Sequence, residues 1–216
     1  MTDGEALIRS VLASPADDAP RLVYADWLEE RGRVEDAEFI RVQIELARLG
    51  FGGAFHKDES GRLRHVPSHV ERLTERQLEL WFAGHGKPEL PAEMANWPMT
   101  VHATPSHNLL IRRGFVERFT LFTDVFLELA AALYKRQPVT QVRLVDRQPV
   151  STGRGYAWSH CTRGNRMDAV PDELWPYLSN AEVVAHIFAT ADGAEAALSW
   201  ACVRYGRAAA GLGDNP

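Results

Sequence analysis

The chain has 216 residues, of which 45% are hydrophobic and 25% charged, and its formal net charge is −5. This composition is typical of a globular protein, and no run of about 18 apolar residues predicts a membrane span. Residues 1–50 carry six basic and eleven acidic side chains, whereas a protein that binds nucleic acid normally concentrates positive charge on one face. The charge distribution therefore argues against nucleic acid as a partner.

The N-terminus and the two cysteines indicate a cytoplasmic protein. The first five residues are acidic and lack the basic and then apolar layout of a secretory signal. Cys161 and Cys202 lie far apart in the sequence. A disulfide between them stays open, but buried thiols in a reducing compartment are the simpler interpretation.

The first fifty residues predict three consecutive helices. Thr2 and Glu5 fit a capping box in front of the first helix, and residues 14–18 break that helix and offer a new cap. The second helix is expected over about 19–31 and the third over about 35–49, each with an apolar face. Short connections make consecutive helices antiparallel neighbours, so we expect a compact helical array.

The next segment, residues 51–110, predicts one helix and an irregular wrap. Ser68 and Glu71 fit a second capping box, which opens a helix over about 68–82. The second half of the segment contains four prolines and no sustained period. We expect it to wrap the domain and to be anchored by Trp97.

A repeat-like unit dominates the last segment, residues 111–216. Residues 116–121 and 139–144 share the pattern apolar-x-x-apolar-x-Leu at a separation of 23 residues, with helical spacing over 123–137 between them. This period lies within the range of leucine-rich repeats. It predicts a parallel strand pair with a helix behind it.

The rest of this segment predicts further short elements. A strand is expected over 155–162, a short helix over 171–178 and a final helix over 193–210. For residues 183–189 both strand and helix stay open, with the strand favoured. The fold class is therefore α+β: an N-terminal helical array, a small mixed sheet with a leucine-rich-repeat-like strand–helix–strand unit, and a C-terminal helix.

Residues 17–32 carry the family resemblance. They read Asp-Asp-Ala-Pro-Arg-Leu-Val-Tyr-Ala-Asp-Trp-Leu-Glu-Glu-Arg-Gly, which resembles the bacterial repeat-companion domain, a module found beside leucine-rich-like repeats. Residues 37–49 are similar to that family's third helix, and residues 113–117 look like the segment that opens the repeat region. The resemblance covers about residues 4–50. It implies a helical companion module followed by degenerate repeats, with no established activity, catalytic residue or cofactor.

Candidate metal and catalytic groups do not form a recognisable motif. The pairs His65 with His69 and His102 with His107 lack the converging set of about four ligands that zinc requires, so we expect no metal, although the role of the histidines stays open. Glycine-rich phosphate loops and a Gly-x-Ser-x-Gly elbow are absent from the sequence. We therefore expect no cofactor and no catalytic residue.

Three carboxylates, Asp26, Glu29 and Glu30, fall within about one helical turn. Paired carboxylates can perform acid–base chemistry, but a solvated helix face is the simpler interpretation. Arg21 or Arg33 could pair with these groups. Alternatively, Asp26 could cap or brace the neighbouring helix.

The sequence is best interpreted as a noncatalytic protein–protein interaction or assembly module whose partner is another protein. Its interaction candidates are Tyr24, Trp27, Arg41, Trp97, Arg113 and Trp158. Two alternatives stay open: an enzyme with an unrecognised site at the sheet edge near Arg113, His160 and Cys161, or a subunit that acts only within an obligate assembly. A deep polar pocket with converging titratable groups would indicate an enzyme, and an exposed apolar and aromatic patch would indicate binding.

Overall fold

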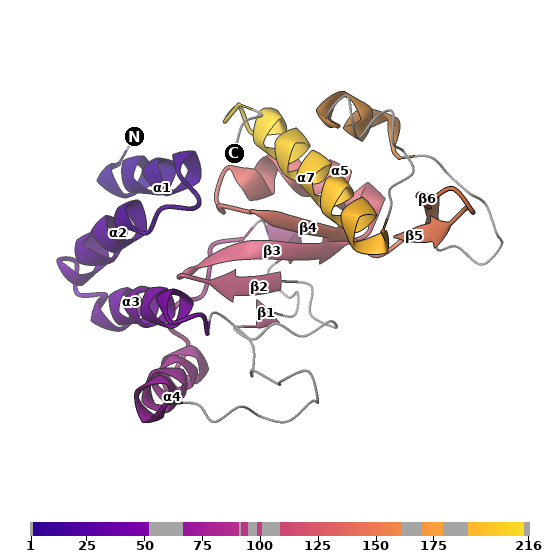
Figure 1. The fold of residues 1–216 in the computed structure, drawn as a ribbon. Coiled ribbons are helices and arrows are strands. Elements are labelled where there is room, and N and C mark those ends of the chain that lie inside the picture. The colour runs from indigo at the N-terminus through magenta and orange to yellow at the C-terminus, as the bar shows by residue number, and fades with distance from the viewer. Residues whose placement is uncertain are drawn as a thin grey trace. The chain divides into compact units, whose positions relative to one another are not determined.

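The computed structural model describes residues 2–51, 67–90, 92–94, 99–100, 109–160, 170–178 and 190–213. The chain divides into two compact units, the first comprising Met1–Glu117 with Arg136–Pro138 and the second Arg118–Lys135 with Val139–Pro216. The predicted α+β class is confirmed, with a helical array at the N-terminus and a helix at the C-terminus (Figure 1).

The helical array of the first unit contains α1 (Asp3–Ala13), α2 (Ala19–Glu29) and α3 (Val34–Arg48), as predicted. The capping box of α1 is confirmed: the Thr2 hydroxyl accepts from the Glu5 amide at 3.3 Å, and the Glu5 carboxylate accepts from the Thr2 amide at 2.7 Å. Apolar side chains then join α2 to α3. The buried members of that cluster are Ala25, Leu28, Ala37, Ile40 and Ile44.

At two further helix starts the predicted side-chain cap is absent. Before α2 the N-cap is Asp18, whose side chain makes no capping hydrogen bond; the neighbouring Asp17 Oδ1 accepts from the Ala19 amide at 2.9 Å. The helix α4 (Ser68–Phe82) has the predicted range, but its predicted capping box is wrong: Pro67 is the N-cap and no side chain caps this end. Pro67 has an extended backbone and its carbonyl accepts the first helical hydrogen bonds, so Ser68 already lies inside the helix.

The main sheet has the strand order β1-β2-β3-β4. Its strands are β1 (Met99–Thr100), β2 (Leu109–Arg112), β3 (Phe115–Leu121) and β4 (Gln141–Leu144). β1 runs parallel to β2 and β3 parallel to β4. The sequence pattern does not predict β2, because its three leading residues are all apolar and buried and therefore show no alternation.

The strand–helix–strand unit is confirmed. β3 and β4 flank α5 (Thr123–Tyr134), and their register pairs Arg118 with Gln141 and Leu121 with Leu144. These pairs are separated by the 23 residues that the repeated pattern predicted. The sheet thus places corresponding positions of the two pattern copies side by side.

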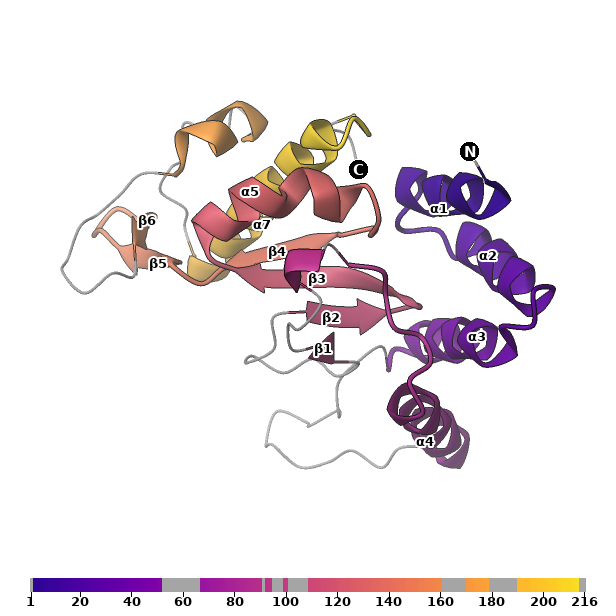
Figure 2. The same cartoon turned by 180° about the vertical axis from the view of Figure 1, so that it is seen from behind.

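The C-terminal helix α7 (Ala191–Ala209) begins at the N-cap Thr190 and packs against α5 and β4 (Figure 2). Cys202 lies on its buried side and is fully buried, as the sequence predicted. Burial also raises the pKa of this thiol well above its usual value. Cys202 is therefore a packing residue.

The second unit also contains an antiparallel hairpin of β5 (Arg147–Ser151) and β6 (Tyr156–His160), followed by the 3₁₀ helix η2 (Asp172–Tyr177). The predicted strand and short helix are confirmed over these ranges, whereas β5 was not predicted. The ambiguous segment 183–189 lies outside the described residues. Within the described ranges, no helix has the length and apolarity needed to cross a membrane.

Candidate functional site

The β2–β3 hairpin turns through two residues, Arg113 and Gly114, that both have positive φ angles of 51° and 84°. This is the combination that a type I′ turn requires. Gly114 is needed for a second reason, since a Cβ at this position would lie 2.4 Å from the side chain of Ile40. Arg113 is the one non-glycine residue with positive φ among the described residues, and such outliers persist only where surrounding contacts hold them.

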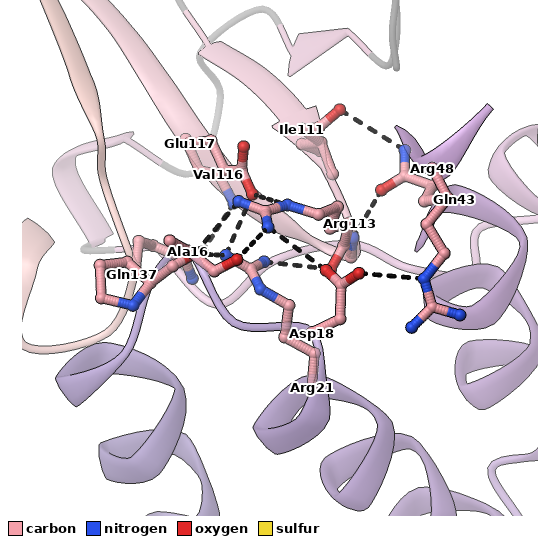
Figure 3. A network of polar contacts seen from close by, with 12 residues as sticks. Ala16, Asp18, Arg21, Gln43, Arg48, Ile111, Arg113, Val116, Glu117 and Gln137 are labelled. Carbon is pink, nitrogen blue, oxygen red and sulfur yellow. Dashed lines mark hydrogen bonds and ion pairs between the residues drawn. The ribbon is translucent and has the colours of Figure 1, made fainter. Parts of the chain in front are cut away.

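The side chain of Arg113 supplies those contacts (Figure 3). Its Nε donates to Glu117 Oε1 at 2.7 Å. Its Nη1 donates to the Ala16 carbonyl at 2.9 Å and to Asp18 Oδ1 at 3.3 Å, and its Nη2 donates to the Pro15 carbonyl at 3.1 Å. All three nitrogens of the guanidinium therefore bind inside the first unit, and they join the hairpin to the segment between α1 and α2.

Arg21 reinforces the same junction from α2 and is fully buried. Its Nη2 lies 2.7 Å from the Pro15 carbonyl and 3.0 Å from Glu117 Oε1, and its Nη1 donates to the Arg113 carbonyl at 3.2 Å. Its guanidinium carbon also lies 5.2 Å from the ring centre of Phe115. Burial lowers the pKa of Arg21 to about 10, with Glu117 opposing that shift.

Two buried glutamines complete the hydrogen bonding of the hairpin. Gln43 of α3 accepts from the Gly114 amide at 2.6 Å and donates to the Ile111 carbonyl at 3.5 Å. Gln137 accepts from the Val116 amide at 2.9 Å. Buried backbone groups must find partners, so these glutamines fix the strand ends.

The network around Arg113 is therefore built to hold structure. Sequence reasoning named Arg113 as a candidate but missed Arg21 and Glu117. A signal for Arg21 was present, because it shares the buried stripe of α2 with Ala25 and Leu28 at helical spacing. An arginine in such a stripe indicates a buried ion pair.

Tyr24 and Trp27 lie on α2 with partly buried side chains. Their rings stack with centroids 5.6 Å apart, and Tyr24 also contacts Phe115 at 5.8 Å. The Trp27 ring covers Gly4 of α1, where a Cβ would lie 2.7 Å from it. The guanidinium of Arg31 lies 4.1 Å from the Trp27 ring centre. Both candidates thus pack α2 against its neighbours.

Arg41 of α3 pairs with the carboxylates of α2. Its Nη2 lies 2.7 Å from Asp26 Oδ1, and it also contacts Glu29. The predicted pairing with Arg21 or Arg33 is wrong, since Arg21 binds Glu117 and Arg33 binds Asp36. The alternative that Asp26 braces the neighbouring helix is confirmed. The hydrogen bond to Asp26 raises the pKa of Arg41.

The remaining candidates do not come together in the described structure. Trp158 of β6 is only 4% exposed, so it cannot offer an accessible ring. Arg113 belongs to the first unit and His160 to the second. Trp97 and Cys161 lie outside the described residues. In the part of the chain that the structure describes, no three His, Cys, Asp or Glu side chains gather as metal ligands.

Several large apolar side chains are exposed. None of them was among the interaction candidates named from the sequence. The exposed fractions are 80% for Phe82, 58% for Phe122, 51% for Val23, 47% for Val34 and 44% for Trp200. Phe82 ends α4 in the first unit, whereas Phe122 precedes α5 and Trp200 lies on α7 in the second. Burial of an aromatic ring is strongly favourable, so these positions are candidates for contact with another molecule.

Comparison with known proteins found no matching family model, no matching curated protein and no matching solved structure.

Proposed function

We propose that this chain is a noncatalytic module for protein–protein interaction or assembly. The observation that carries the proposal is the exposure of the large apolar side chains Phe82, Phe122 and Trp200. Full burial of one such side chain contributes about 1.5–3 kcal/mol. Aromatic residues of this kind also dominate the energetics of protein interfaces. A protein partner is the occupant that gains most from these positions.

Three arginines of the first unit support the same proposal. Arg21, Arg41 and Arg113 all bind carboxylates of the chain itself. Their contacts therefore stabilise the fold and leave recognition to the exposed apolar side chains. We also propose membership of the repeat-companion family for the helical array, supported by the helix α2 (Ala19–Glu29) within the residues 17–32 that carry the resemblance.

A cytoplasmic location is part of this proposal. The thiol of Cys202 is free and buried, which suits a protein that functions in a reducing compartment. Measurement of the protein in fractionated cells tests this point, since recovery outside the cytoplasm would contradict it.

Affinity capture with quantitative mass spectrometry tests the interaction. The tagged protein is retrieved from its native cells alongside Phe82→Ser, Phe122→Ser and Trp200→Ser. The matched control is Glu128→Ser on the exposed side of α5. We expect a stoichiometric partner that the control retains and at least one aromatic variant loses. A protein that captures nothing, or whose partner is indifferent to all three changes, contradicts the proposal.

A further inference from the structure

We draw no further inference here: the strongest candidate, the polar cavity of about 260 Å³ between β4, the β5–β6 hairpin and α7 in the second unit, carries none, because the Arg143 and Glu195 side chains in its lining pair with each other and nothing in the described part of the chain shows what would occupy it.

Discussion

Glu117 is the residue on which the polar network of the first unit depends. It is 5% exposed and its Oε1 lies 3.0 Å from Arg21 and 2.7 Å from Arg113. Arg21 is itself completely buried, so no water compensates its charge. A buried pair of this kind contributes modestly as a whole, but loss of one partner leaves an isolated charge at high cost.

We therefore predict that Glu117→Gln lowers the free energy of unfolding by about 3–5 kcal/mol. The matched control is Glu195→Gln, because Glu195 forms an ion pair with Arg143 in which both side chains are about half exposed. Loss of this exposed ion pair should cost less than about 1 kcal/mol. Urea denaturation of both variants measures the difference. Equal losses for the two variants would show that the buried network is not organised around Glu117.

At the residue scale, only part of this network could be predicted from the sequence. The periodicity of α2 separates buried from exposed positions, and it places Arg21 on the buried side. The periodicity does not reveal the counterion of Arg21, because Glu117 lies 96 positions later in the strand β3. Ion pairs across such separations depend on tertiary structure, and a single sequence carries no record of them.

At the element scale, α3 and α4 are joined by a two-pronged ion pair. Arg76 Nε and Nη2 donate to Glu38 Oε1 and Oε2 at 2.8 and 2.7 Å. The hydrogen bond from Arg76 lowers the pKa of Glu38. The folded state therefore holds the Glu38 carboxylate in its ionised form more strongly than the unfolded chain does.

The sign of the pH dependence follows from that lowered pKa. The stabilisation is fully present above the unfolded pKa of about 4.5 and is lost as the pH falls through the lower folded pKa. We predict that Glu38→Gln costs about 0.5–1 kcal/mol at neutral pH, a value limited by the partial exposure of both side chains, and that this cost shrinks progressively as the pH is lowered below about 4.5.

Urea denaturation at several pH values measures the Glu38 effect. Glu45→Gln, at an exposed position of the same helix, is the matched control and should change stability by less than about 0.5 kcal/mol. A cost of Glu38→Gln that persists undiminished in acid would contradict the ion-pair origin.

The contact of α5 with α7 depends on a glycine. A Cβ at Gly206 would lie 2.1 Å from the ring of Tyr134, and this tyrosine is only 1% exposed. We predict that Gly206→Ala lowers the free energy of unfolding by about 1–3 kcal/mol, although alanine favours helices. In a Tyr134→Ala background the same change should become neutral or stabilising, and a thermal denaturation cycle of the four proteins measures this coupling.

The elements differ in how well the sequence predicted them. The helices and the β3–β4 register follow from periodicity and from a 23-residue repeat, which are local or directly visible patterns. β2 and β5 were missed for physical reasons. β2 is apolar almost throughout, and β5 contains Pro149 and exposed polar residues, so neither shows the alternation that indicates a strand.

For the whole molecule, tertiary structure decides which aromatic rings are exposed. Sequence reasoning selected aromatic rings by residue type, and the structure shows Trp158 buried and Tyr24 half-buried, with Phe82 and Phe122 exposed. Exposure depends on which elements cover each ring, and type alone does not determine it. The exposed rings on which the proposed interaction rests could therefore not be located from the sequence.

The effect of salt on binding of the proposed partner distinguishes two kinds of contact, those made through the net charge of −5 and those made through the exposed apolar side chains. Charge-driven contacts weaken as the screening length falls from about 8 Å at 0.15 M to about 3 Å at 1 M ionic strength. Apolar burial does not weaken in this way. Because the proposal rests on Phe82, Phe122 and Trp200, we predict that the captured partner is retained when washes are raised from about 0.15 M to about 1 M sodium chloride. Release of the partner at high salt, with the aromatic variants still binding at low salt, would assign recognition to charged side chains instead.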